Sequence, residues 1–237
     1  MDKKVLKHLF SKVKIILRGD VYQITLDDRV VRTPGGNNIY IPNYNLAKAI
    51  RSEWKAQKSK FCPTTMPMMQ FACTVIDHVI PNRNQVISKV LNYAETDLLC
   101  YRCDTPLDLK ALQDQSWQPF LDWSKEVLSA PLISVSGYRY IKQPDESLDV
   151  LRKNIENYND WELLVISQMT QLMTSLILTL SVVNSYVDWR VAFQASVLEE
   201  EYQRKRWGEV PEAIKAQNSK FNELNHSVQF LKLLRSE

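Results

Sequence analysis

The sequence has little glycine and little histidine, and each shortage narrows the chemistry that the chain can support. Only five of its 237 residues are glycine, at positions 19, 35, 36, 137 and 208. They cannot be arranged into either of the common loops that bind phosphate groups, which disfavours a standard nucleotide site. The three histidines occur without a nucleophile motif, which disfavours a catalytic triad. Asp77 and His78 are neighbours on a predicted helix, so their side chains point about 100° apart and cannot orient one another.

Cysteine is also scarce, and no secretory signal precedes the four cysteines. We expect reduced thiols, as in a cytosol-like compartment. Cys100 and Cys103 form a C-x-x-C pair, but the predicted helices do not supply the setting of a thioredoxin-like motif. A zinc site would need a second pair at matching spacing, and ten residues separate Cys62 from Cys73. Structural or incidental thiols and no metal site are therefore expected, with a thiol enzyme built on Cys100 and Cys103 as an alternative.

Positions 163–187 contain no charged residue, a run long enough to span a bilayer. Gln168 and Gln171 lie near its middle and would be costly in a single span without partners, so a buried central helix is favoured. The N-terminus, MDKKVLKHLFSKVK, is basic and poor in acids, as a mitochondrial presequence would be, but strand-like sequence begins by Val13. We expect an uncleaved bacterial cytoplasmic chain, or a chain of the mitochondrial matrix if the source is eukaryotic.

The net charge of +3 conceals an uneven distribution. Residues 1–60 contain thirteen lysines and arginines against five acids, whereas the remaining residues contain seventeen against twenty-two. A basic front suggests a nucleic-acid-binding module as one alternative function. The bases are scattered through predicted strands and a helix, however, and they do not cluster with aromatic residues at a recognisable spacing. A solvated surface is the simpler interpretation.

The first forty residues predict an antiparallel meander. The β-branched runs VKIILR, VYQITL and RVVRT are separated by turn residues, and a strong turn at 34–37 leads to a fourth run, IYIP. From Asn45, the expected cap, apolar residues recur at helical spacing. One short strand is expected within LLCYR, and helices are predicted near 69–79, 83–95, 108–128, 145–157, 160–183, 188–206 and 211–233. The fold class is therefore α+β: a small β-rich N-terminal domain (residues 1–80) followed by a larger, mostly α-helical domain (81–237).

The stretch LEEEYQRKRWG at 198–208 combines three acids, three bases, a tryptophan and a glycine. On a continuous helix over 188–206, Glu199 would lie about 70° and Glu201 about 90° to either side of the apolar stripe, and Glu200 would point outward. The charge of Glu199 would be the least balanced locally. Two i,i+4 ion pairs are expected, Glu200 with Arg204 and Glu201 with Lys205. Periodicity alone predicts a salt-bridged surface helix whose glycine forms a left-handed cap.

Eight blocks of the sequence follow one another in a characteristic order. They are TLDDRVVRTPGGNNIYIP, LAKAIRSEWKAQ, PTTMPM, TVIDHV, YAETDLLCYR, WQPFLDW, MTSLILTL and LEEEYQRKRWG. Together they resemble the ATP synthase assembly chaperone family called mitochondrial complex assembly factor two, and YAETDLLCYR is the most specific block. Three residues depart from the pattern: Asp28 and Thr174 stand where glycine is frequent, and Cys103 stands where a small residue is usual. These departures predict an altered hairpin turn, looser packing in the central helix and an accidental C-x-x-C.

The resemblance implies a bacterial chaperone that binds the unassembled alpha subunit of the F-type ATP synthase and promotes its assembly. It implies a β-rich front and a helical back, with no enzyme activity, cofactor or small-molecule substrate. By the same resemblance, Glu199, Glu200 and Glu201 are expected to face the client protein. Trp54 matches the family's helix tryptophan and is a further candidate for client binding, although its helical core spacing equally predicts a packing role.

Overall fold

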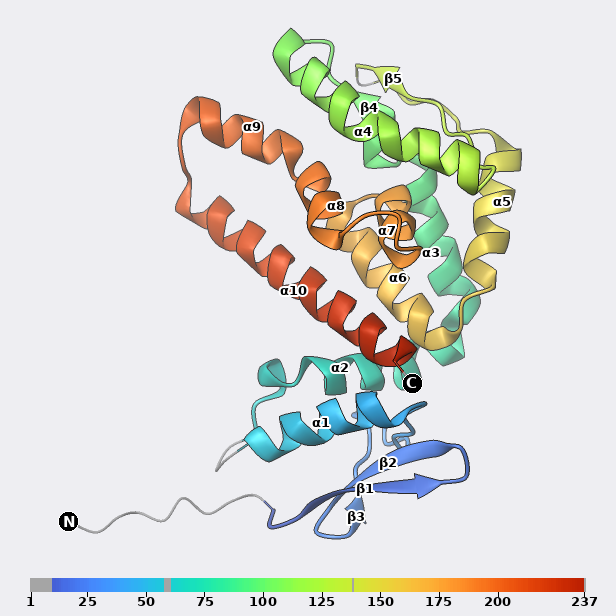
Figure 1. The fold of residues 1–237 in the computed structure, drawn as a ribbon, viewed down its shortest axis with the longest axis vertical. Helices are drawn as coiled ribbons and strands as arrows, with labels where there is room; N and C mark the ends of the chain where they lie inside the picture. The colour runs from blue at the N-terminus through green and yellow to red at the C-terminus, as the bar shows by residue number, and fades with distance from the viewer. Residues whose placement is uncertain (1–9, 58–60, 138, 237) are drawn as a thin grey trace, which may run out of the picture. The chain divides into compact units, whose positions relative to one another are not determined.

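The structure is a computed structural model that describes residues 10–57, 61–137 and 139–236 (Figure 1). The predicted α+β class is confirmed, because a small antiparallel sheet near the N-terminus is followed by a mostly helical chain. The chain divides into two compact units, and the division is not a single boundary near residue 80. The first unit extends to Arg83 and also includes Asp160–Leu164 and the residues from Val228 onward. The second unit consists of Asn84–Asn159 and Val165–Ser227.

The sheet of the first unit has the order β1 (Val13–Arg18), β2 (Val21–Leu26) and β3 (Arg29–Val30). Its strands are antiparallel, and Ile15 of β1 lies opposite Ile24 of β2. The first two strands are confirmed at their predicted bounds. The third is shorter than the predicted RVVRT, and the prediction of a strand at IYIP is wrong. Instead, Ile41 of this run forms an isolated bridge with Tyr22, and a second isolated bridge joins Arg32 to Asn38.

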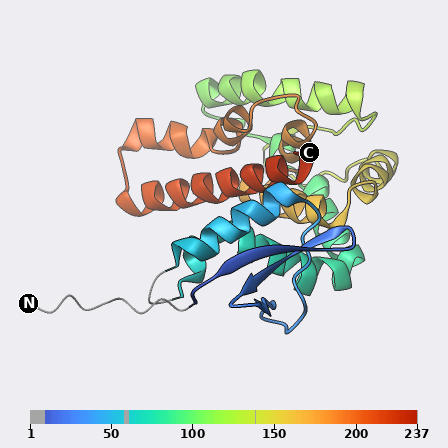
Figure 2. The same ribbon diagram turned by 60° about the horizontal axis from the view of Figure 1, so that its bottom comes forward.

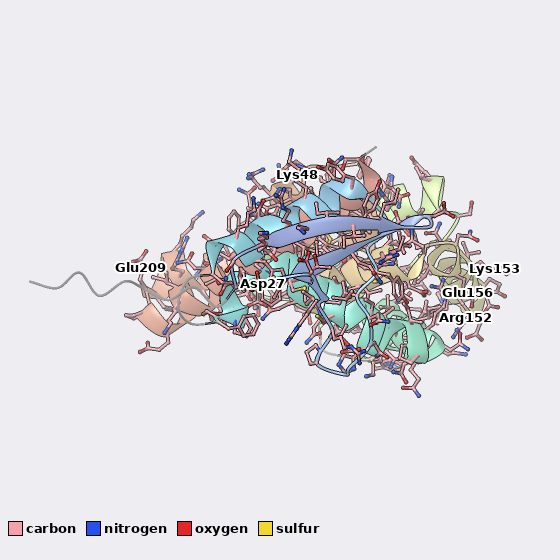
Figure 3. All side chains as sticks on the ribbon, turned by 90° about the horizontal axis from the view of Figure 1, so that it is seen from below. Asp27, Lys48, Arg152, Lys153, Glu156 and Glu209 are labelled. Atoms are coloured by element: carbon pink, nitrogen blue, oxygen red, sulfur yellow. The ribbon has the colours of Figure 1, made fainter. Side chains whose placement is uncertain are left out.

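The turn between β2 and β3 has left-handed backbone at both Asp27 (φ 47°) and Asp28 (φ 67°). Two consecutive positive φ angles suit a tight hairpin and would ordinarily favour glycine. Here the carboxylates add local contacts. Asp27, labelled in Figure 3, accepts the backbone N–H groups of Ser11 and Lys12 at 2.9 and 2.8 Å, and Asp28 pairs with Lys14 at 2.6 Å.

Helix α1 (Tyr44–Ala56) is capped by Asn43, and the prediction of Asn45 as the cap is wrong. The side-chain oxygen of Asn43 accepts the N–H of Leu46 at 2.9 Å, while its amide nitrogen donates to two carbonyls near the end of α10 (Pro211–Arg235). One side chain therefore satisfies backbone groups at the ends of two helices. Helix α1 packs on β1 and β2 (Figure 2). Its buried residues are Leu46, Ala47, Ile50 and Trp54.

Two polar residues of α1 hold the segment that follows it. Glu53 accepts two N–H groups in the first turn of α2 (Pro67–Thr74), at 2.8 and 2.9 Å. Burial raises the pKa of Glu53 to about 7, although these two hydrogen bonds favour the charged form. Gln57 is buried and bonds the loop before α2, accepting from the N–H of Cys62 at 2.9 Å and donating to the hydroxyl of Thr65 at 3.0 Å.

Asp77 fixes the loop at 33–37 that closes the meander. It lies in a π-helical turn, η2 (Val75–Val79), which continues α2 and leads into a short 3-10 turn, η3 (Ile80–Asn82). Its carboxylate accepts from the Thr33 hydroxyl at 2.7 Å, the Gly35 N–H at 2.9 Å and the Asn37 side-chain amide at 2.8 Å. A Cβ at position 35 would lie 2.8 Å from that carboxylate, so only glycine fits there. Asp77 of the TVIDHV block therefore binds the TPGGN residues of the first sequence block.

Aromatic rings explain why two late segments belong to the first unit. Phe71 meets Phe230 edge to face, with ring centroids 5.2 Å apart. Phe230 also stacks on Trp161 at 6.1 Å, and Trp161 contacts Tyr40 at 6.5 Å. Such pairs add to the burial of large apolar area. The first unit is thus completed by residues at least 130 positions from its sheet.

The remaining helices lie wholly or largely in the second unit. They are α3 (Arg83–Glu95), α4 (Leu107–Val127), α5 (Asp145–Glu156), α6 (Asp160–Met173), α7 (Leu176–Val183), α8 (Trp189–Ser196) and α9 (Leu198–Trp207). The helices predicted near 83–95, 108–128, 145–157 and 211–233 are confirmed to within about two residues at each end. LLCYR divides into a 3-10 turn, η4 (Leu98–Cys100), and a short strand, β4 (Tyr101–Arg102), which pairs in parallel with β5 (Val135–Ser136).

The prediction of one helix over 160–183 is wrong, because the chain breaks between α6 and α7. Thr174 has left-handed backbone (φ 52°), and the hydroxyl of Ser175 caps α7. The fully buried carboxylate of Asp97 accepts the N–H of Ile177 at 3.2 Å, which anchors the new helix start to the YAETDLLCYR block. Burial raises the pKa of Asp97 to about 6 against the effect of these donors. None of the described helices is both long enough and apolar enough to cross a membrane.

The prediction of one helix over 188–206 is also wrong. In a continuous helix the carbonyl of Ala195 would accept the N–H of Glu199, but here it accepts the indole N–H of Trp117 at 2.9 Å. Helix α8 therefore ends at Ser196, and α9 begins after Val197 with a new phase.

Candidate functional site

Helix α9 is a ten-residue helix of which no residue is buried. Its acids lie in the first turn and its bases in the last turn, the arrangement that the helix dipole favours. Gly208 ends the helix with φ 93° and ψ 177°, so the predicted left-handed helical cap is wrong and the chain leaves extended. A short connection, marked by Glu209 in Figure 3, leads into α10. We call residues 198–227 the α9–α10 hairpin (Figure 1).

Glu199 is half-buried and faces α4. The side-chain amide of the fully buried Gln113 donates to its carboxylate at 2.5 Å, and the same Gln113 accepts the N–H of Cys103 at 2.8 Å. Burial raises the pKa of Glu199, the neighbouring charge of Glu200 raises it further, and the hydrogen bond from Gln113 opposes both. In the described part of the chain, Glu199 forms no ion pair.

Glu200 and Glu201 have cationic partners. The Glu200 carboxylate lies 3.7 Å from the ammonium of Lys220 on α10, and its side chain is 54% exposed. Glu201 pairs with Arg204 and accepts a hydrogen bond from the side-chain amide of Gln217 at 2.8 Å. The outward position predicted for Glu200 is confirmed. The predicted i,i+4 pairs are wrong, because both carboxylates find partners on α10 or three residues along α9.

The hairpin exposes two large apolar side chains. Trp207 is 72% exposed and Val210 is 57% exposed. With Ile214 they line a cavity of 330 Å³ whose rim carries charges of both signs, from Glu200, Arg204 and Lys220. An exposed tryptophan beside a shallow apolar hollow is the kind of anchor that protein interfaces use.

A larger groove of 620 Å³ is lined by α8, α9 and α10 and reaches Leu112 of α4. Aromatic rings of Phe193 and Phe221 form part of its wall. The Tyr202 hydroxyl, also on the groove, donates to the carboxylate of Asp108 at 2.9 Å and so ties α9 to the start of α4. The hairpin therefore has hollows suited to side chains of a protein partner.

Trp54 belongs to the first unit, whereas the three glutamates belong to the second. It is 8% exposed, stacks on Phe61 at 5.4 Å and meets Phe10 edge to face at 5.9 Å. The structure thus gives Trp54 a packing role, and the four candidate residues do not share one unit.

The C-x-x-C pair has none of the properties of a reactive dithiol. All four cysteines are free. Cys100 is buried, and burial raises the pKa of the thiols of both Cys100 and Cys103, whereas a reactive cysteine needs a lowered pKa. Within the residues that the structure describes, no three His, Cys, Asp or Glu side chains lie close enough to hold a metal ion.

Residues 7–125, just over half of the chain, match the family model described as ATP12 chaperone protein. The chain belongs to the ATP12 chaperone family. Its match to the mitochondrial protein atp12 of Schizosaccharomyces pombe has 25% identity over 215 residues, covering 86% of this chain and 74% of that protein. The resemblance found from the motifs is thereby confirmed.

Two solved structures agree with the fold along nearly the whole chain. Atp12 of Paracoccus denitrificans superposes with a TM-score of 0.92 at 32% identity, covering 97% of this chain and 99% of that one. A protein of Agrobacterium tumefaciens, Atu1473, gives 0.91 at 29% identity, covering 96% and 85%. The match to the family model ends at residue 125, before α9. The two solved structures cover 97% and 96% of this chain and therefore extend well beyond that point.

The motifs located the hairpin but not the residues that surround its acids. Gln113, Gln217 and Lys220 approach α9 from other helices, and no local spacing signals such contacts. Trp207 could have been singled out, because a tryptophan beside a helix-ending glycine in a strongly charged segment has no apolar stripe to join. Helix propensity and i,i+4 spacing alone favoured the wrong ion pairs.

Proposed function

We propose that this protein is a non-enzymatic chaperone that binds the unassembled alpha subunit of the F-type ATP synthase and promotes its assembly. The α9–α10 hairpin is the client-binding surface, and Glu199, Glu200 and Glu201 face the client. Membership of the ATP12 family supports the chaperone role. The alpha subunit is the client that the motif resemblance implies.

The observation that carries the proposal is the exposure of α9. A helix that buries none of its ten residues gains little from packing within its own protein. It nevertheless carries Trp207, whose exposed ring would be buried at little entropic cost by a partner. An unassembled subunit exposes apolar interface that would otherwise aggregate, and such a client can cover this surface.

The charges beside the apolar hollow suit a reversible complex. Exposed acids and bases orient a partner and accelerate its association more than they tighten the complex. A holding protein needs this moderate affinity, because the true assembly partner must later displace it. In a bacterium this work would take place in the cytoplasm, and in a mitochondrion in the matrix. No feature of the described residues favours the nucleic-acid alternative.

Co-purification with a tagged, unassembled alpha subunit tests the proposal. We expect a complex, together with suppression of alpha-subunit aggregation measured by light scattering. Absence of both would refute the proposal. Reversing one charge sharpens the test: Glu199→Lys should weaken the complex at least tenfold while the melting temperature changes by only a few degrees.

Glu126→Lys is the matched control. Glu126 is exposed, lies on α4 and is outside the hairpin. The same charge change there should leave client binding within about twofold. If Glu199→Lys instead lowers stability strongly while its folded fraction binds normally, the hairpin acids are structural.

A further inference from the structure

The three glutamates of α9 differ in one respect that their sequence positions do not show. Glu200 and Glu201 are each within ion-pair distance of a basic side chain. Glu199 is half-buried, yet in the part of the chain that the structure describes its only hydrogen-bond donor is the neutral amide of Gln113. A partly buried carboxylate with one neutral donor is short of stabilisation.

Glu199 lines a cavity of 320 Å³ that is separate from the two hollows of the hairpin. Its wall includes Thr96, Tyr101, Cys103, Gly137 and Thr174. Two of these wall residues lie where regular secondary structure is interrupted. Thr174 and Gly137 both have positive φ angles, and Thr174 marks the gap between α6 and α7. A cavity of this size accommodates a long side chain and is too small for a helix.

The charges around the cavity favour a cation. Arg102 also lines it, but its guanidinium is already bound by Asp114 at 2.5 Å and by Gln118 at 2.7 Å. The carboxylate of Asp104 would lie 2.8 Å from a Cβ at Gly137, which places a second acid beside the wall. Asp114 also pairs with Lys110 at 3.3 Å. Among the described residues, the cavity therefore presents the carboxylate of Glu199 without an ion pair, the nearby acid Asp104, and an arginine that is held by Asp114.

We propose that this cavity receives one basic side chain, an arginine or lysine, from the client protein and pairs it with Glu199. The identity of the partner rests on the proposed function; the chemistry of the cavity does not. Pairing would relieve the cost of the half-buried carboxylate, and a planar guanidinium could bond it at two points. A neutral side chain of the same shape would leave that carboxylate unpaired and would be rejected.

A small probe tests the cavity without any client. We would titrate the ¹⁵N-labelled full chain with N-acetyl-arginine N-methylamide at constant ionic strength. The matched neutral probe is the corresponding citrulline amide. We expect saturable shifts of the backbone amides of Thr96, Cys103 and Gly137 with the arginine probe, and an at least tenfold weaker response to citrulline. Equal responses to the two probes would overturn the proposal.

Three variants locate the binding. Glu199→Gln keeps the size of the side chain and should abolish saturable binding of the arginine probe. Glu126→Gln makes the same change at an exposed acid of α4, outside the hairpin and the cavity, and should leave the affinity within about twofold. Thr96→Trp fills the cavity from its exposed rim with Glu199 intact, and it should also block the probe. Unchanged affinity in Glu199→Gln or in Thr96→Trp would refute the site.

The client experiment separates this proposal from the proposed function. If the wild-type protein binds the arginine probe but no alpha subunit, the proposed function fails and the cavity stands. If the alpha subunit binds wild type and Glu199→Gln equally well, the chaperone function stands and the client does not use the cavity. Loss of both probe and client binding in well-folded Glu199→Gln is the result that we expect.

Discussion

Replacing Asp77 by alanine should destabilise the first unit, because this carboxylate is the single acceptor for three donors of the loop at 33–37. The donors are the Thr33 hydroxyl at 2.7 Å, the Asn37 amide at 2.8 Å and the Gly35 N–H at 2.9 Å. Burial opposes ionisation of Asp77, but the three hydrogen bonds outweigh it and lower the pKa of the carboxyl. The charged form is therefore the one that the fold prefers.

The magnitude follows from the number and exposure of these bonds. A hydrogen bond to a charged group contributes about 1.5–3 kcal/mol, and a partly exposed one contributes less because water can replace the lost partner. Three part-exposed bonds therefore give a loss of about 2–3 kcal/mol for Asp77→Ala. Asp20→Ala is the control, because Asp20 is exposed in the β1–β2 turn and should change stability by less than about 0.5 kcal/mol.

Urea unfolding of both variants measures the loss, and a double-mutant cycle with Thr33→Val measures how much of it passes through one bond. We expect a coupling energy of about 1 kcal/mol between Asp77 and Thr33. Hydrogen exchange should show faster exchange at the Gly35 amide in Asp77→Ala and unchanged exchange in Asp20→Ala. A loss below about 0.5 kcal/mol, with the Gly35 amide still protected, would refute the reasoning.

Three further outcomes are expected. Burial raises the pKa of Glu53 to about 7, above its unfolded value, so the folded state binds the extra proton and stability should fall as pH rises from about 4.5 to 7. The urea midpoint should therefore be higher at pH 5 than at pH 8, by an amount worth about 1–2 kcal/mol. An equal pH dependence in Glu53→Gln would contradict this. Thr174→Gly should raise the melting temperature by about 2–4 °C, because a β-branched residue is strained at φ 52°, and a lowered melting temperature would contradict the strain. Trp207→Ala should leave the melting temperature within about 1 °C but weaken client binding at least tenfold. Tyr140→Ala removes another largely exposed ring, outside the hairpin, and should leave both the melting temperature and client binding unchanged.

Local patterns predicted most of the fold. The alternation of β-branched residues located β1 and β2, and proline and glycine marked the limits of several helices. The failures occurred where a long-range contact decides a local outcome. Nothing near Ala195 shows that its carbonyl will bind Trp117, a residue 78 positions away, and nothing near Ser175 shows that Asp97 will anchor the start of α7.

The same distinction between local and long-range contacts applies to the candidate site. The three glutamates and their unequal exposure could be predicted, because helical geometry needs only local spacing. The half-buried state of Glu199 could not, because it depends on Gln113 of α4. Thr174 stands where glycine is frequent, from which we expected looser packing. The structure shows a different reason for glycine there, because Thr174 has a positive φ angle at the break between α6 and α7 and lines the cavity.

The aromatic contacts of Phe230 have a consequence for the order of biosynthesis. The ribosome makes the sheet and α1 first. Phe71 cannot contact Phe230, and Asn43 cannot bond the end of α10, until residues 228–236 have been made. The second unit, by contrast, has all its residues once Ser227 is made. The unit that is translated first is thus the last that can be completed, and a chain stopped at 227 would retain the α9–α10 hairpin while its N-terminal unit lacked a wall of its core.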